Sequence, residues 1–245
     1  TMWLFINGQK CICHPGDIIH LQAGQSHGMG WITDCKWRGT YHDYEVYPEN
    51  REVREVLNYM PDAKDDPELM KFYREMDHIN VEPAVDLKEV PAEECLAVKN
   101  INRPWASYDF PGVSMKIVVE RWENGGSKEL CCAVMEPGFK AEWDQYPNLR
   151  EVFYVRTGKV KFNIMGEEVI ADKECVVDIP RFAPHSVEAL EHSEVYDLGG
   201  QTCWSLFLQD YTSIKQCDPQ RLEKPETIAA LKAQYGCQIK SISMK

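Results

Sequence analysis

Two stretches of the sequence that lie 158 residues apart share one pattern of glycines, apolar runs and histidines. Gly8 precedes His27 by nineteen residues, and Gly166 precedes His185 by the same number. The offset needs no gap, and it also aligns the apolar pair at 18–19 with a second apolar pair. In each stretch an apolar strand leads into a glycine turn, a second strand and a short apolar run follow, and a loop delivers one histidine. We therefore predict a β-hairpin unit that the chain uses twice.

The part of the chain that holds the second copy is rich in short strand-like runs. Between Val113 and Leu208, alternating or apolar runs recur at regular spacing, which is typical of a β-sandwich or a β-barrel. The predicted strands cover residues 114–120, 129–135, 151–155, 159–164, 175–179 and 203–208. We expect an all-β fold for this part of the chain.

The segment between the two copies has a different character. Residues 49–79 are charged and favour helix, with Pro67 at a good first helical position, so two short helices are expected there. Residues 80–112 carry prolines at intervals, which favours an extended connection. A last helix is predicted from Pro225 to Tyr235, because a proline begins this run and Gly236 follows it.

The composition limits the partners and the compartment. The chain has 27 basic and 39 acidic side chains, a formal net charge of -12, so nucleic acids and anionic membranes are poor partners. A neutral or cationic small ligand fits better.

No apolar run approaches the ~20 residues of a transmembrane helix, so we expect no membrane span. The ten cysteines contain no CxxC pair of zinc-site spacing, and we predict reduced thiols in a cytoplasmic protein.

Two groups of residues in the second half resemble the sequence motifs of the cupin superfamily. The first cupin motif is a glycine, two histidines one residue apart, a glutamate and, after six more residues, a glycine. The second is a glycine, a proline region and a histidine. The first motif is matched by Gly138, Glu151 and Gly158, and the second by Gly166, Pro180 and His185. The resemblance implies a cupin-type double-stranded β-helix, or jelly-roll barrel.

The same resemblance implies a metal site with an unusual set of ligands. In cupins, three histidines and the glutamate hold one divalent metal at the barrel mouth. Glu151 and His185 occupy two of these ligand positions, but Asp144 and Tyr146 stand where the histidine pair would be. Because oxygen donors suit iron and manganese, we expect one of these ions rather than zinc if the site is filled. Tyr146 and Glu151 are the expected catalytic residues, since each could move a proton.

The first copy keeps the second motif, from Gly8 through a Pro-Gly-Asp turn at 15–17 to His27. We predict His27 as a ligand of a second metal site. Its partner motif would lie upstream of Thr1, where we expect about 45 residues of a first barrel, counted from the second copy. The predicted fold is therefore a cupin barrel with a partial second cupin unit and a few short helices. The predicted division is residues 1–48 for the C-terminal half of a first barrel, 49–112 for a helical and proline-rich connection, 113–210 for the second barrel, and 211–245 for a tail with one helix.

Two functions remain open from the sequence. The first is a divalent-metal-dependent enzyme of dioxygenase, isomerase or lyase type that acts on a small oxygenated substrate. The second is a metal-free module that binds or senses a small ligand, in which Glu151 orients that ligand or pairs with Arg150 or Arg181. The loss of the histidine pair favours the second function. For either function we expect a homodimer that binds neither nucleic acid nor membrane.

Overall fold

The structure is a computed structural model of the chain, and it describes residues 1–22, 27–39, 67–68, 87–124, 129–143, 151–198, 204–235 and 239–243. The chain divides into two compact units. The first unit comprises Thr1–Pro15 and Ala23–Val98, and the second, which we call the barrel unit, comprises Gly16–Gln22 and Lys99–Lys245. Among the described helices, none combines the length and the apolarity that are required to span a bilayer.

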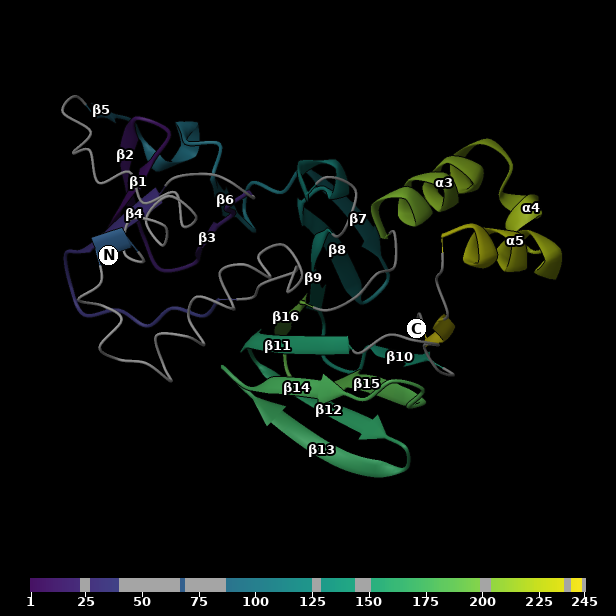
Figure 1. Ribbon diagram of the computed structural model, residues 1–245. Helices are drawn as coiled ribbons and strands as arrows, with labels where there is room; N and C mark the ends of the chain where they lie inside the picture. Colours follow the sequence, from purple (N-terminus) through teal and green to yellow (C-terminus); the bar gives the residue numbers. More distant parts are fainter. Residues whose placement is uncertain are drawn as a thin grey trace. The chain divides into compact units, whose positions relative to one another are not determined.

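The barrel unit contains two antiparallel sheets (Figure 1). One has six strands in the spatial order β14 (Val176–Ile179), β11 (Glu151–Thr157), β16 (Ser193–Asp197), β9 (Leu130–Met135), β8 (Val113–Val119) and β7 (Ala106–Phe110). The other has five strands in the order β13 (Glu167–Asp172), β12 (Lys159–Ile164), β15 (His185–Ala189), β10 (Lys140–Trp143) and β17 (Ile239–Ser243). From β9 to β16 the chain passes repeatedly between the two sheets, as it does in a jelly roll. The predicted all-β jelly-roll barrel is confirmed.

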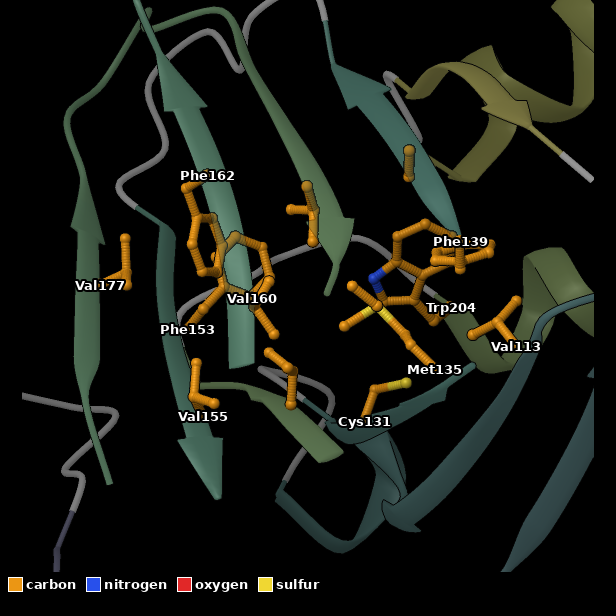
Figure 2. Close-up of a cluster of buried hydrophobic side chains, with 14 of the residues drawn as sticks. Val113, Cys131, Met135, Phe139, Phe153, Val155, Val160, Phe162, Val177 and Trp204 are labelled. Carbon is orange, nitrogen blue, oxygen red and sulfur yellow. The ribbon is translucent and has the colours of Figure 1, made fainter. Parts of the chain in front are cut away.

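The core of the barrel lies between the two sheets and is built by side-chain alternation. Along β11 every second residue faces inward, so Phe153 and Val155 are buried, and along β12 the same alternation buries Val160 and Phe162. The rings of Phe153 and Phe162 lie 5.8 Å apart, and Figure 2 shows side chains from both sheets meeting in this cluster. Phe162 is 0% exposed, so removal of its ring would leave a cavity that neighbouring residues cannot fill.

Three helices follow the barrel strands: α3 (Trp204–Cys217), α4 (Pro219–Leu222) and α5 (Pro225–Tyr235). The prediction of a helix from Pro225 to Tyr235 is confirmed, whereas the predicted strand at 203–208 is wrong. Residues from Trp204 onward form α3, which buries Trp204, Phe207 and Leu208 in the barrel core. These three positions share one helical face, and so short an apolar run does not distinguish a strand from a helix.

The first unit holds a four-stranded sheet in the order β4 (His27–Trp31), β1 (Met2–Ile6), β2 (Gln9–Cys13) and β5 (Lys88–Glu89). A two-stranded sheet pairs β3 (Asp17–Ile19) with β6 (Val98–Asn100), and except for Val98 these residues belong to the barrel unit. Of the residues predicted to form helices between 49 and 79, the structure describes Pro67 and Glu68, and both are helical. The others lie outside the described residues.

The repeat predicted from the glycine and histidine spacing is present in the strand pairing. Met2 pairs with Cys13 and with Trp31 in the first unit. The residues 158 positions later show the same register, because Val160 pairs with Ala171 and with Ala189. The two stretches therefore form the same three-stranded arrangement, β4–β1–β2 and β15–β12–β13.

The hairpin turn of each copy requires a glycine. The two central residues of the turn have positive φ in both, 49° at Asn7 and 72° at Gly8, and 55° at Met165 and 93° at Gly166. This is the backbone of a type I′ turn, whose twist matches that of the strands that it joins. Glycine adopts the second of these conformations without strain, which explains its recurrence at this place in the repeat.

Candidate functional site

Glu151 is a buried carboxylate at the first position of β11. It shares the inward face of that strand with Phe153 and Val155, and it is 3% exposed. A carboxylate in such a place is costly unless another group compensates for its lost hydration. The structure places that group on the opposite sheet.

His185 is the first residue of β15 and is also buried. Its Nε2 atom lies 3.0 Å from Oε2 of Glu151, so the two motif positions that carry cupin ligand types meet in the structure. Its Nδ1 atom lies 3.0 Å from the carbonyl oxygen of Ala183. The ring of Phe153 lies 6.3 Å from the imidazole and forms an apolar side of this pair.

The hydrogen bond to Ala183 decides what lies between Glu151 and His185. A carbonyl oxygen only accepts, so Nδ1 of His185 must carry a hydrogen. In a neutral imidazole the other nitrogen, Nε2, then presents a lone pair to the carboxylate oxygen. Two electron-rich atoms 3.0 Å apart in a buried place repel each other unless a proton or a cation lies between them. The pair is therefore built to hold one positive charge.

The geometry of the pair fits a shared metal ion as far as the described residues extend. Two ligands at right angles, each about 2.1 Å from one ion, lie about 3 Å from each other, which is the separation found here. Metal-binding histidines also commonly donate their second ring nitrogen to a backbone carbonyl, as His185 does to Ala183. Within the described part of the chain, however, no three His, Cys, Asp or Glu side chains form a group that could hold a metal. Asp144 and Tyr146 lie outside the described residues.

His27 occupies the same strand position as His185 but does not share its burial. It begins β4 and pairs with Ile6, just as His185 begins β15 and pairs with Ile164. Its side chain is exposed, whereas that of His185 is buried. The described residues of the first unit therefore offer no counterpart of the Glu151 and His185 pair, and a metal role for His27 stays a prediction.

A second buried acidic group, which sequence reasoning missed, lies at the start of α3. The carboxylate of Glu129 accepts hydrogen bonds from the backbone N–H of Ser205 at 3.1 Å and from its hydroxyl at 2.7 Å. Burial raises the pKa of Glu129 above its usual range, and the nearby Glu120 carboxylate raises it further, while the bonds from Ser205 oppose the shift. Burial is also the main reason why the pKa of Glu120 is raised. Ser205 follows Glu129 by 76 positions, so no local pattern could have revealed the contact.

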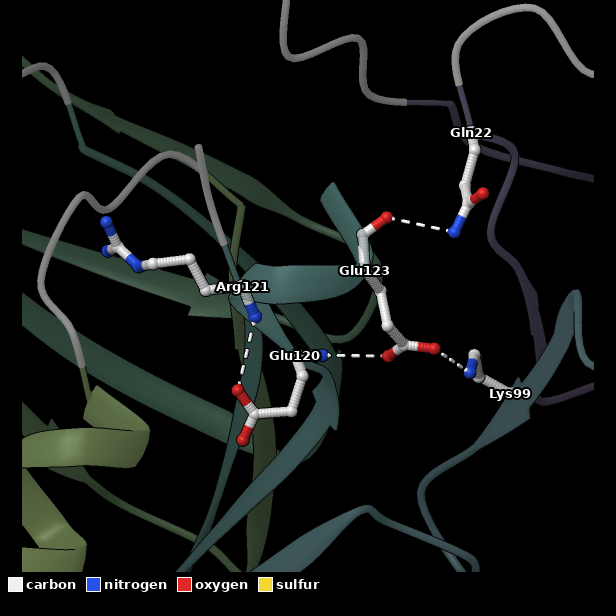
Figure 3. Close-up of polar contacts among 5 residues, drawn as sticks. All are labelled: Gln22, Lys99, Glu120, Arg121 and Glu123. Atoms are coloured by element: carbon white, nitrogen blue, oxygen red, sulfur yellow. Dashed lines mark hydrogen bonds and ion pairs between the residues drawn. The ribbon is translucent and has the colours of Figure 1, made fainter. Parts of the chain in front are cut away.

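Glu123 lies at the centre of a polar network just after β8, shown in Figure 3. Its carboxylate pairs with Lys99 and accepts a hydrogen bond of 3.0 Å from the backbone N–H of Glu120. Its carbonyl oxygen accepts one of 3.0 Å from the side-chain amide of Gln22. This network holds the segment Gly16–Gln22 within the barrel unit although its sequence neighbours belong to the first unit.

Comparison with known proteins gives matches to solved structures only. KdgF from Halomonas sp. is 23% identical, with a TM-score of 0.34, over 38% of this chain and 82% of the other. Ectoine synthase from P. lautus is 14% identical, with a TM-score of 0.34, over 37% of this chain and 65% of the other. A structure described as a predicted oxalate decarboxylase from Thermotoga maritima is 16% identical, with a TM-score of 0.32, over 35% and 75%.

No protein-family model and no curated protein matches the chain. With TM-scores between 0.32 and 0.34, the structural likenesses do not extend to activity. The jelly-roll fold is established by the strand order and pairing of the barrel unit itself.

Proposed function

We propose that this cupin-type barrel binds a small oxygenated molecule next to Glu151 and His185, and that a divalent metal ion shared by these two side chains assists a reaction on it. One observation carries the proposal. The buried Nε2 and Oε2 atoms face each other at 3.0 Å while Nδ1 is committed to Ala183, so the pair needs a positive charge between its members.

Asp144 and Tyr146 are the further ligands that we propose. With Glu151, they would give a set of three oxygen donors and one imidazole, which favours iron or manganese over zinc. When bound, such an ion polarises carbonyl or enediol oxygens or supports dioxygen chemistry, which corresponds to isomerase, lyase or dioxygenase activity.

The roles of the chain's own residues follow from their environment. Ala183 fixes the imidazole of His185 in one tautomer, so that Nε2 is the nitrogen that faces the site. Phe153 flanks the imidazole and restricts the access of water to the pair. Glu151 and Tyr146 are the two candidates for moving a proton to or from the substrate.

A metal-free binding module is the alternative, and one observation favours it. A single proton on the Glu151 and His185 pair would also remove the repulsion between the two atoms, without any ion. Within the described residues, only this acid and this histidine come together in the barrel interior. In this case the pair would bind a polar ligand without catalysing a reaction.

Metal retention distinguishes the two functions. The full chain is incubated with excess manganese or ferrous iron, desalted, and analysed for metal by mass spectrometry. We expect about one ion per chain, loss of that ion in His185→Ala, and only partial loss in Tyr146→Phe, because a neutral phenol is a weaker metal ligand than an imidazole. The matched control is His192→Ala, since His192 is 57% exposed and pairs with Glu136. Retention of far less than one ion by the wild type would reject the metal-dependent enzyme in favour of the binding module.

Compartment and assembly also belong to the proposal. All eight cysteines that the structure describes are free thiols, which supports a reducing cytoplasmic location. A homodimer is the proposed assembly, to be measured by analytical ultracentrifugation.

A further inference from the structure

Two apolar residues of the barrel unit occupy backbone positions that disfavour them. Met165 and Phe182 have φ angles of 55° and 65°, a left-handed conformation that bulky residues rarely adopt. Phe182 is the third residue of a turn in which the N–H of Ala183 donates to the carbonyl oxygen of Pro180 at 3.3 Å, and glycine or asparagine is usual there when φ is positive. The side chains of Met165 and Phe182 are 68% and 53% exposed. Packing in the barrel core therefore does not explain their presence.

The repeat shows which residues stand at the same two positions in the first copy. The offset of 158 aligns Met165 with Asn7 and Phe182 with Gly24. Asparagine and glycine are the residue types that adopt a positive φ with least strain. The second copy has instead an exposed apolar side chain at both positions, so two separate changes in it have the same character.

The turn that contains Phe182 lies between the two members of the candidate site. Ile179, the last residue of β14, pairs with Glu151 of β11. The turn follows at once, and the carbonyl oxygen of Ala183 within it lies 3.0 Å from Nδ1 of His185. The turn therefore joins the strand beside Glu151 to the strand that begins with His185.

Met165 is tied to the other side of the same loop. Its backbone N–H donates to the carbonyl oxygen of Pro184 at 2.9 Å, and Pro184 directly precedes His185. The residue before it, Ile164, pairs with His185 across β12 and β15. Met165 and Phe182 therefore both lie at the end of the barrel that holds the candidate site.

Glu174 shows that a positive φ does not by itself call for an apolar residue. Its φ is 68°, and the repeat aligns it with Gly16, whose φ is 97°. Glu174 is exposed, and its N–H donates to the carbonyl oxygen of Val155, four residues along β11 from Glu151. Among the described residues of the barrel unit, the non-glycine residues with positive φ are thus apolar beside the site and polar away from it.

We propose that Met165 and Phe182 form an apolar rim of the Glu151 and His185 site and bind an apolar part of its substrate. The inference rests on the proposed function, in which the pair holds the oxygenated part of that molecule. A methionine and an aromatic ring in water gain stability when a ligand covers them, and both adapt to flat or irregular apolar groups. The buried carboxylate and the net charge of -12 disfavour an anion.

The substrate class that fits is a neutral carbonyl or hydroxyl compound with an alkyl chain or an aromatic ring. Two hydroxyketones with the same –CO–CH2OH group test this: hydroxyacetone carries a methyl group and 2-hydroxy-1-phenylethanone carries a phenyl ring. Isothermal titration calorimetry of the full chain with manganese gives the affinity of each. We expect the phenyl ketone to bind about tenfold more tightly, because the rim removes part of its ring from water.

Three variants with the same new residue locate the source of this preference. Met165→Asn and Phe182→Asn suit the positive φ but lack the apolar surface, so the preference should fall to about threefold in each and nearly vanish in the double variant. Glu174→Asn makes the same change at the same kind of backbone position away from the site, and it should keep the tenfold preference. Retention of the preference by the double variant would overturn the proposal, and so would failure of the wild type to prefer or to bind the phenyl ketone.

Failure of the proposed function gives a different result. His185→Ala should weaken both ketones by the same factor and leave their ratio unchanged, because it removes only the group that faces the oxygenated part. Unaltered binding of both ketones by His185→Ala would reject the proposed site, whatever the rim variants do. The thermal midpoint of each rim variant should lie within about 3 °C of the wild type, because both side chains are largely in solvent. A large fall in that midpoint with unchanged affinities would assign Met165 and Phe182 to the fold and overturn their role in binding.

Discussion

The carboxylate of Glu129 accepts hydrogen bonds from both the backbone N–H and the hydroxyl of Ser205, and it thereby fixes the start of α3 to the start of β9. Burial raises the pKa of Glu129, so the folded chain holds its proton more tightly than the unfolded chain does. The stability that this proton contributes is present below the ordinary pKa of a carboxyl and is lost as the pH rises toward the raised value.

Glu129→Gln removes this titration and keeps an acceptor for Ser205. We expect the stability of the variant relative to the wild type to increase as the pH rises from about 4.5 upward. Urea unfolding measured at several pH values tests this, with Glu167→Gln, an exposed position, as the control. A stability difference that is the same at every pH would contradict the prediction.

Replacement of one member of the Glu151 and His185 pair should lower the free energy of unfolding more than replacement of both. His185→Leu leaves a buried carboxylate without its partner at 3.0 Å, and the expected loss is about 3 kcal/mol. The double variant Glu151→Leu with His185→Leu removes both polar groups from an apolar core and should be destabilised less. Urea unfolding of the two single variants and the double variant measures this coupling, and additive losses would show that the pair does not interact.

Gly158 cannot accept a side chain, for two independent reasons. Its φ is 81°, and an added Cβ would lie 2.3 Å from both the carbonyl oxygen of His192 and the hydroxyl of Ser193. Gly166→Ala is the matched control, since its φ is 93° but no atom lies within 4 Å of the added Cβ. We expect Gly166→Ala to lower the free energy of unfolding by about 1 kcal/mol, because only its positive φ is strained. Gly158→Ala should lower it by at least about 3 kcal/mol, because its Cβ also collides with neighbouring atoms. Thermal unfolding of both variants gives the comparison, and equal losses would mean that the contact with His192 relaxes easily.

The cysteines should react with alkylating reagents in an order set by burial. Cys35, Cys175 and Cys217 are exposed, whereas Cys131 and Cys132 are buried. Burial raises the pKa of Cys132 to about 12, so the reactive thiolate is scarce there at neutral pH. Pulse labelling with iodoacetamide followed by peptide mass spectrometry should find Cys35, Cys175 and Cys217 modified before Cys131 and Cys132. Early labelling of Cys132 in the folded chain would contradict this order.

Local sequence patterns predict the repeat, the strand pairing within it and the positions of Glu151 and His185. Equal glycine to histidine spacing predicted a repeat that the structure reproduces down to the pairing register of β1 and β12. The motif positions Glu151 and His185 meet at 3.0 Å, because each begins a strand whose alternation turns its side chain toward the space between the two sheets. The predicted roles of Asp144, Tyr146 and His27 stay predictions.

Contacts between distant segments could not be predicted in the same way. The first residues of α3 form a short apolar run that predicts a strand equally well, and only the barrel core against which they pack decides their conformation. The bond between Glu129 and Ser205 joins residues 76 positions apart, and neither residue stands out in its own neighbourhood. The strand order is needed to see that, among the described residues, β2 has β5 as a second neighbour whereas β13 pairs with β12 alone.

The pairing of β10 with β17 has a consequence for how the barrel forms on the ribosome. Lys140 at the start of β10 pairs with Ser243, and the other members of this sheet lie between them in the sequence. One flank of β10 therefore has no partner until the three helices and β17 have been translated. A nascent barrel would expose this strand for the whole of that interval, when pairing between neighbouring nascent chains is easiest. Chaperone occupancy is consequently expected to persist until residues 239–243 have left the exit tunnel.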